Sequence, residues 1–425
     1  VLVRAKAGPE EVKAIGITGQ LDGCAGVDAE GKALTPCLIW MDRRAGLPLM
    51  SGLRERIRLR CGINPDPGHM AAKVRWLLDH APESSRAACF HQPVSYLVSR
   101  LTGMSVFDHG LASTTMLYDL QRQDYDVELL EAFGIARGKL PRIAPAESRA
   151  GELTKAGAEL IGLLPGIPVA VGTGDDFASP LGAGILDPGS AVCVSGTAEV
   201  VGALSRIPAI DQKCLVETHC YPGNLFFIEN PGWLSGGALE WFVAAFGLKD
   251  VEELDRHAAE VAAGADGVLF LAALSGSMAP EWNSRARGCF YGLTSAHATG
   301  HLARAVLEGC AFCMRDVVAR LQELNVPAER IVLIGGGAKS ALWARVRADV
   351  SGLMVYRAAY RDTAPIGAGM LAAVAAGFQP DLKACASLIK VDGEQIAPNM
   401  KVKPVYDAAY REYRRLFECL RPMWA

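Results

Sequence analysis

The sequence predicts an α/β protein in which helices pack on a parallel or mixed β-sheet. In the last third of the chain, apolar strands alternate with helices, at 331–334, 341–350, 354–356 and 366–376. Such alternation is typical of sheets covered by helices. Strands are also expected at 191–194 and 199–204, where they flank Ser195-Gly196-Thr197 and form a β-hairpin with a small, polar tip. A chain of 425 residues is long enough for two or three domains with cores of their own.

The first half of the chain combines short strands with a mostly helical segment. Strands are expected at 14–18, 25–28 and 37–40, and the segment from about 71 to 120 is mostly helical, with a helix at 72–80. Pro165-Gly166-Ile167-Pro168 then restarts β structure. The strand 169–171 runs into a loop rich in Gly and Asp at 172–176, and a helix of small residues follows at 178–184.

Composition argues against several classes of partner. Lys and Arg number 43 against 46 Asp and Glu, the net charge is −3, and no basic run suggests nucleic-acid binding. The longest apolar stretch, 364–378, is too short to span a membrane. The 12 cysteines are scattered, and Cys310 and Cys313 lie in an apolar helical pattern that predicts buried thiols rather than a metal or redox site. We therefore expect small molecules or other proteins as partners, and a reducing, cytoplasmic location.

Loops rich in Gly, Ser, Thr or Asp follow strands at 174–176, 195–197 and 335–338. Ligands of open α/β sheets bind where loops leave the strand ends. Glycine lets the backbone approach a phosphate, and free backbone N–H groups there supply donors. Any one of these loops alone is more commonly a tight turn, but the three together, one with an acidic pair, indicate a nucleotide phosphotransferase.

Asp175 is the candidate catalytic base. An acidic residue at a strand end, flanked by glycine, can face a cleft and accept the proton of a sugar hydroxyl that attacks the γ-phosphate. An ordinary Asp has a pKa of about 3.9, so it accepts the proton late rather than holding an alkoxide. Asp176 is better placed to cap the helix that begins near Ala178.

Polar residues at the ends of the early strands are candidates for sugar binding. They are Gln20, Asp22, Asp42 and Arg44, which together offer both donors and acceptors. Taken singly, a residue of this kind is more commonly a solvated loop residue or a member of an ordinary ion pair.

Several segments resemble one known family in the expected order. Residues 288–293 and 301–308 resemble the C-terminal signature of FGGY carbohydrate kinases, and the similarity covers essentially the whole chain. The segments 15–23 and 38–44 resemble the sugar loop and the Trp-x-Asp-x-Arg loop of xylulokinases. The segments 172–176, 195–197 and 335–340 are similar to the catalytic, second phosphate and adenosine loops.

The resemblance implies two actin-like (ribonuclease-H-like) ATPase domains, at 1–187 and 188–425, with ATP and sugar in the cleft between them. It implies Asp175 as base, Gly196 and Thr197 as phosphate contacts, and Gly336, Gly337 and Ser340 as adenosine contacts. Gln20, Asp22, Asp42, Arg44 and Asp176 would line the sugar side. Mg²⁺ is expected with ATP, because the metal neutralises charge in phosphoryl transfer.

The chain departs from the xylulokinase pattern in three places. Leu21-Asp22 stands where Met-His is common, and Gly276-Ser277-Met278-Ala279-Pro280 stands where Gly-Glu-Arg-Thr-Pro is usual. The family also opens with a strand hairpin whose Asp-x-Gly-Thr loop holds phosphate, and the printed sequence begins downstream of it, so that the first domain is incomplete at its start. We expect the natural protein to carry such a loop upstream of Val1.

The leading functional hypothesis is phosphorylation of D-xylulose to D-xylulose 5-phosphate. The alternatives are a kinase for another ketose or polyol, and a non-catalytic paralogue that binds sugar or nucleotide. A homodimer is left open. An NAD-dependent enzyme is disfavoured, because Gly335-Gly336-Gly337 lacks the GxGxxG spacing and the strand 354–356 leads into Arg357 rather than an acidic residue.

Overall fold

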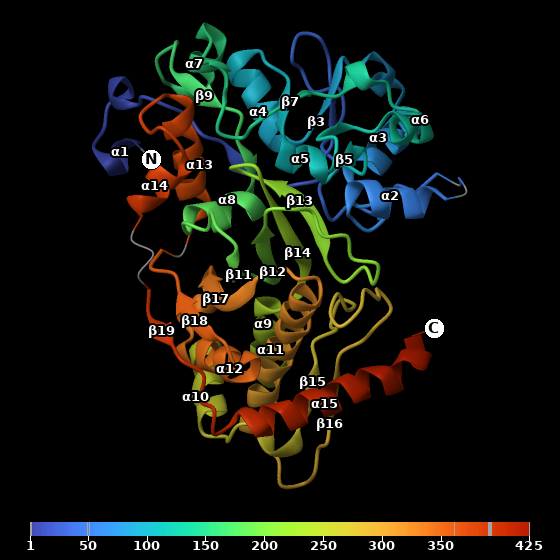
Figure 1. Cartoon of the computed structure of the whole chain (residues 1–425), viewed down its shortest axis with the longest axis vertical. Helices are drawn as coiled ribbons and strands as arrows, with labels where there is room; N and C mark the ends of the chain where they lie inside the picture. The colour runs from blue at the N-terminus through green and yellow to red at the C-terminus, as the bar shows by residue number, and fades with distance from the viewer. Residues whose placement is uncertain (1, 49, 51, 361, 390–392, 425) are drawn as a thin grey trace.

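The computed structural model describes residues 2–48, 50, 52–360, 362–389 and 393–424. Elements from the first half of the chain gather in one part of the molecule, drawn at the top of Figure 1. The long strands and most helices of the second half form the other part, below it. Helix α8 (Asp175–Gly182) lies where the two parts meet.

The first part contains short strands that pair two by two. They are β1 (Thr18–Gly19) with β10 (Thr173–Gly174), β2 (Ala25–Val27) with β3 (Cys89–His91), β4 (Val106–Asp108) with β7 (Arg142–Ala144), β5 (Tyr118–Asp119) with β6 (Asp124–Tyr125), and β8 (Arg149–Glu152) with β9 (Pro168–Ala170). The helices here are α1 (Leu2–Ala5), α2 (Leu53–Cys61), α3 (Met70–His80), α4 (Pro93–Thr102), α5 (His109–Ser113), α6 (Val127–Phe133) and α7 (Lys155–Ile161).

The second part is built on a seven-stranded mixed sheet in the order β13-β14-β12-β11-β17-β18-β19. Its strands are β11 (Gly189–Ser195), β12 (Ala198–Ser205), β13 (Glu217–Tyr221), β14 (Leu225–Leu234), β17 (Ala328–Ile334), β18 (Met354–Arg357) and β19 (Gln395–Ile396). A separate pair joins β15 (Leu269–Leu271) to β16 (Cys289–Tyr291). The helices of this part are α9 (Gly236–Phe246), α10 (Val251–Ala259), α11 (Thr299–Glu323), α12 (Ala341–Ser351) and α15 (Lys403–Leu420). Two more helices from this half of the chain, α13 (Ala364–Ala375) and α14 (Leu382–Ser387), lie with the upper part in Figure 1.

The centre of this sheet is buried on both faces. Ile331 and Leu333 of β17 join one apolar core, whereas Val332 and Ile334 join the other. This division follows from the strand geometry, because successive side chains point to opposite faces. The near-continuous apolar run of β17 is thus typical of a strand covered by helices on both sides.

Helices α8 and α13 pack closely through glycine. A Cβ on Gly182 would lie 1.8 Å from the Thr363 carbonyl oxygen, and one on Gly367 would lie 2.1 Å from the Ala178 carbonyl oxygen. Figure 1 shows α13 beside α8 although some 190 residues separate them in sequence. Only glycine permits so close a backbone approach at these positions.

Most of the predicted elements are confirmed. The expected helices 72–80, 341–350 and 366–376 correspond to α3, α12 and α13, and the expected hairpin is β11–β12, paired antiparallel. Cys310 and Cys313 are buried in α11, as the apolar pattern indicates. Among the described residues, no helix combines the length and hydropathy needed to cross a membrane.

Two of the predicted strands are longer than the pairing that the structure shows. The strand 14–18 is reduced to β1 and a single bridge from Ile15 to Val169. The strand 37–40 is reduced to one bridge between Leu38 and Cys24, and the side chains of Ile39 and Trp40 are exposed. These apolar runs have strand propensity, but tertiary pairing decides whether a ladder continues.

Candidate active site

The five residues predicted to bind ATP line one cavity of about 610 Å³. Gly196 and Thr197 come from the β11–β12 turn, and Gly336, Gly337 and Ser340 from the segment between β17 and α12. Because β11 and β17 are parallel neighbours, their ends lie side by side and bring the two loops together. The structure thus unites residues that are about 140 positions apart in sequence.

Glycine is needed in the second loop for two reasons. Gly335 has a φ of +85°, in the region that disfavours other residues. A Cβ on Gly337 would lie 2.1 Å from Ser195 Oγ, whereas a Cβ on Gly336 would meet nothing closer than the Ser195 carbonyl oxygen at 3.9 Å. Gly337 therefore serves the packing of the two loops, and Gly336 leaves open the space that a ligand could use.

A buried ion pair lies beneath these loops. Arg347 of α12 donates hydrogen bonds from Nη1 and Nη2 to the two carboxylate oxygens of Glu199 on β12, and neither side chain is exposed. Glu199 also accepts hydrogen bonds from Ser195 Oγ (3.2 Å) and Ser235 Oγ (2.6 Å). The pair thereby ties β12 and α12 to the turn that bears Gly196 and Thr197.

The opposite wall of the cavity comes from a segment that sequence reasoning missed. It includes Glu240 of α9 and, around the start of α10, Asp250, Glu252 and Asp255. Burial raises the pKa of Asp255. These acidic residues belong to an ordinary helical pattern, with Asp250 as the N-cap of α10, so no local signal marks them as cavity residues.

The acidic pair Asp175-Asp176 opens helix α8, and this corrects the sequence prediction. We expected a loop at 172–176 and a helix beginning near Ala178, with helix capping as the alternative role of Asp176. Instead Gly174 is the N-cap, and both aspartates lie in the first helical turn. Two carboxylates are favourable at this end of the helix, where the backbone N–H groups are free and the helix dipole is positive.

Both carboxyl groups have a raised pKa. Burial raises the pKa of Asp175. Burial, together with the charges of Asp175 and Asp22, raises the pKa of Asp176 to about 7. A raised pKa makes a carboxylate a better proton acceptor than an ordinary Asp, as general-base catalysis requires.

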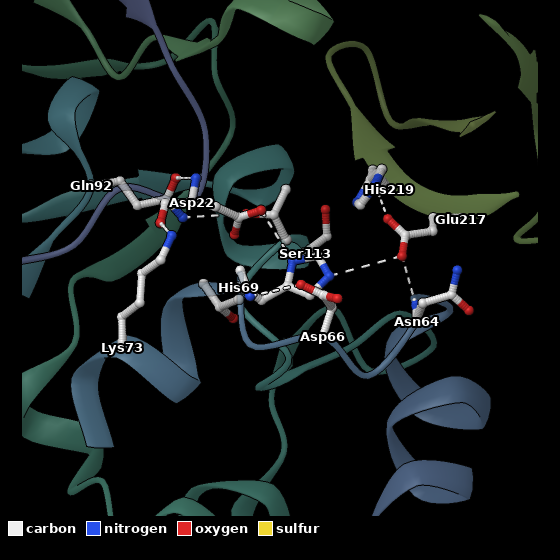
Figure 2. A network of polar contacts seen from close by, with 12 residues as sticks. Asp22, Asn64, Asp66, His69, Lys73, Gln92, Ser113, Glu217 and His219 are labelled. Carbon is white, nitrogen blue, oxygen red and sulfur yellow. Dashed lines mark hydrogen bonds and ion pairs between the residues drawn. The ribbon is translucent and has the colours of Figure 1, made fainter. Parts of the chain in front are cut away.

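Asp22 is held by neighbours on several elements (Figure 2). Its backbone N–H donates to Gln92 Oε1 (2.9 Å), and its carbonyl oxygen accepts from Lys73 Nζ (2.7 Å). Its carboxylate Oδ2 lies 3.0 Å from Nδ1 of His69, the residue before α3. The charge of Asp22 acts on Asp176, so these two predicted sugar-side residues are near each other.

The remaining residues predicted to bind sugar are Asp42, Arg44 and Gln20. Asp42 and Arg44 pair with each other, Nε to Oδ1 at 2.9 Å, and the Arg44 guanidinium lies over the Trp76 ring. Asp42 is close enough to Lys73 for its charge to act on that amine. Gln20 directly follows β1 and is half-buried. Gln20 thus lies at the strand end, and no side-chain hydrogen bond to another described residue defines its role.

Buried titratable residues on the β13–β14 hairpin also escaped sequence reasoning. Glu217 and His219 alternate on β13, and Glu229 of β14 is the register partner of Glu217. Burial raises the pKa of Glu229 well above its usual value, with the charge of Asp176 adding to the effect. The available signal was a pair of titratable side chains at positions i and i+2 of a strand, because such side chains share one face.

Metal ligands do not form a self-sufficient site in the described part of the chain. No group of three or more His, Cys, Asp or Glu side chains there is arranged to hold a metal ion. An ion in this site would therefore depend on ligands brought by a bound nucleotide.

Comparison with known proteins gives a consistent result. The FGGY family of carbohydrate kinases matches through its N-terminal domain at residues 1–182 and its C-terminal domain at 191–376. The xylulose kinase of Escherichia coli (strain K12) is 30% identical over 421 residues, which cover 98% of this chain and 87% of that protein. The glycerol kinase of Thermococcus gammatolerans is 31% identical over 403 residues, which cover 92% of this chain and 80% of that protein.

A solved structure agrees over nearly the same span. The xylulose kinase from Rhodospirillum rubrum superposes with a TM-score of 0.85 at 30% identity, covering 96% of this chain and 84% of that one. The match extends over both parts of the molecule, and the shared architecture is the two-domain, actin-like ATPase fold. The chain therefore belongs to the FGGY family of carbohydrate kinases, phosphotransferases that use ATP as co-substrate.

Proposed function

We propose that this protein transfers the γ-phosphoryl group of ATP to a neutral ketose or polyol, with D-xylulose as the first candidate and D-xylulose 5-phosphate as its product. Xylulose kinases and glycerol kinases are both about 30% identical to the chain, so relatedness alone favours neither substrate. The observation that carries the proposal is the half-buried pair Asp175-Asp176 at the amino end of α8, with Asp22 nearby.

Asp175 acts as the general base in the proposed reaction. The sugar oxygen forms a bond to the γ-phosphorus while the bond from that phosphorus to the β,γ-bridging oxygen breaks. The hydroxyl proton passes to the Asp175 carboxylate, and ADP leaves. Catalysis then depends on positioning and charge stabilisation, because phosphoryl transfer demands little covalent chemistry of the protein.

The charges of the site favour a neutral substrate over a sugar acid. Asp22, Asp175, Asp176 and Glu229 are close enough for several of their charges to act on one another. Carboxylates accept hydrogen bonds from hydroxyl groups, whereas a substrate carboxylate would add a like charge to a partly desolvated cluster.

Mg²⁺ is part of the proposal. Proteins usually bind it through phosphate oxygens, water and one or two carboxylates, and the carboxylates of Asp175 and Asp176 fit that requirement. When bound, the ion would neutralise charge on the phosphate oxygens.

The test is ADP release by the purified protein with ATP, Mg²⁺ and a panel of D-xylulose, D-ribulose, glycerol, xylitol and D-gluconate. We expect turnover with at least one neutral member and none with D-gluconate. Asp175→Asn should lower kcat by about 10²–10⁴-fold with little effect on ATP affinity, because it keeps the shape but removes the proton acceptor. Wild-type kcat in this variant would remove Asp175 from the mechanism.

The alternative is a non-catalytic paralogue that binds sugar or nucleotide. Calorimetric binding of ATP or a sugar, without turnover of any panel member, would favour it.

A further inference from the structure

A chain of alternating carboxylates and imidazoles connects the two parts of the molecule. It runs from Asp22 through His69 to Glu217, His219 and Glu229 (Figure 2 shows the first four). His69 Nδ1 lies 3.0 Å from Asp22 Oδ2, and its Nε2 lies 3.8 Å from Glu217 Oε1. One imidazole ring therefore lies between a sugar-side carboxylate of the first domain and a buried carboxylate of the sheet in the second.

His69 is presented for this role by the turn before α3. Asp66 accepts a hydrogen bond from the backbone N–H of Gly68 (2.7 Å), and its carbonyl oxygen accepts one from the N–H of His69 (3.2 Å). His69 is the N-cap residue of α3, yet its side chain makes no capping hydrogen bond. The ring is committed to the carboxylates instead.

Neighbouring charged groups favour the protonated form of His69 and the ionised form of Glu217. Burial opposes protonation of His69, but the carboxylates of Asp22 and Glu217 outweigh it and raise its pKa well above 6.5. Burial likewise opposes ionisation of Glu217, but hydrogen bonds from His219 and His69 lower its pKa to about 2. Glu217 is anchored independently of His69, because its Oε1 accepts from the Asn64 backbone N–H at 2.7 Å.

The Asp22 carboxylate is constrained but not fully used by the protein. Asp22 has a φ of +55°, an uncommon backbone conformation for a residue other than glycine. Its Oδ1 is buried and has no hydrogen-bond partner among the described residues. Burying a carboxylate oxygen without a hydrogen-bond donor costs free energy. A substrate hydroxyl could supply such a donor.

We propose that His69 is a positioning residue for sugar binding: through Nδ1 it holds the Asp22 carboxylate in the orientation that accepts a substrate hydroxyl, and through Nε2 it ties that carboxylate to the second domain. This inference rests on the proposed sugar kinase function. It gives His69, and Glu217 with which His69 is in contact, a role in sugar binding that the sequence motifs did not predict.

The test separates the two contacts of one ring. An Asn side chain can place its amide nitrogen near the position of Nδ1, and a Gln side chain can place its own near the position of Nε2. His69→Asn thus keeps a donor for Asp22, whereas His69→Gln keeps one for Glu217, and His69→Phe keeps neither. His91→Phe is the control, because His91 is also buried but its ring nitrogens contact the hydroxyls of Ser95 and Ser105 rather than carboxylates.

The measurement is KM for the best neutral substrate of the panel and KM for ATP, with folding checked by thermal unfolding. We expect His69→Phe and His69→Gln to raise the sugar KM by about 10- to 100-fold, the range of one hydrogen bond to a charged group. His69→Asn should raise the sugar KM less than His69→Gln does, because it loses only the contact to Glu217, and the ATP KM should be unchanged throughout. Asp22→Asn should raise the sugar KM, and adding His69→Phe to it should cost little more.

Each other result contradicts the inference in a recognisable way. A wild-type sugar KM in a folded His69→Phe, while Asp22→Asn raises it, leaves the kinase proposal standing and removes His69. Equal effects of the Asn and Gln variants, or loss of folding in all three His69 variants but not in His91→Phe, would show a structural role instead. A wild-type protein that turns over no neutral panel member contradicts the proposed function, and this inference with it.

Discussion

The two middle positions of the loop after β17 should respond differently to an added side chain. Gly336→Val places its methyl groups in the cavity, because an added Cβ would meet no protein atom closer than 3.9 Å. Gly337→Ala instead directs its methyl at Ser195 Oγ, 2.1 Å from the ideal Cβ position. The first variant should thus lose ligand affinity, and the second should lose loop packing.

The size of each effect follows from the space available. Forcing extra methyl groups into an occupied contact costs about 1–3 kcal/mol. For Gly336→Val this predicts about 5- to 150-fold weaker ADP binding with an unchanged unfolding temperature. For Gly337→Ala the same cost falls on the folded state, because Ser195 must move and it contacts Glu199 of the buried ion pair.

Calorimetric titration with ADP and thermal unfolding, on both variants and the wild type, provide the comparison. Unchanged ADP affinity in a folded Gly336→Val protein would show that the loop is only a turn. A Gly337→Ala protein that is as stable as wild type would refute the packing argument.

Two more predictions concern charge. Burial raises the pKa of Asp175, the proposed base, and burial with the charges of Asp175 and Asp22 raises the pKa of Asp176 to about 7. Protonation of these carboxylates should therefore lower kcat/KM at a higher pH than it would for an ordinary Asp, and an acid limb near pH 4 in a direct ADP assay would contradict this. Arg347→Met should destabilise the fold by about 3–5 kcal/mol in urea unfolding, because it leaves the Glu199 carboxylate buried and unpaired. Adding Glu199→Gln should recover much of that loss, and equal stability of the single and double variants would count against a buried ion pair as the cause.

Local pattern was sufficient for the elements and loops that form the nucleotide side. Strand 331–334, the Gly-rich segment after it and helix 341–350 follow one another within about 20 residues, and their burial pattern is visible as a continuous apolar run. Local pattern marked these loops, and the resemblance to FGGY kinases then named Gly196, Thr197, Gly336, Gly337 and Ser340, all of which line the same cavity. Parallel neighbours carry their loops to the same edge of a sheet, so strand order alone brings these residues together.

The start of α8 was less predictable, because Gly-Asp-Asp is compatible with both a loop and a helix beginning. Only the folded structure shows that Gly174 is the N-cap of α8 and that both aspartates lie in its first turn. The raised pKa of each carboxyl is likewise a property of the surrounding fold, since burial is its main cause.

The contacts of Asp22 were beyond the reach of the sequence altogether. The sequence marks Asp22 as a polar residue after a strand, but its partners Lys73, Gln92 and His69 come from later segments, and Glu217 lies some 150 residues beyond His69. Side chains that far apart meet only if the helices and strands that carry them pack together, and neither periodicity nor a short motif encodes that meeting. The sequence determined which chemical groups the protein has and which loops line the proposed nucleotide cavity. The tertiary structure decided which carboxylates are buried, which are paired with an imidazole, and which carboxylate oxygen has no partner among the described residues. The physical reason is that the burial of a side chain and its distance from other side chains depend on how the whole chain is folded.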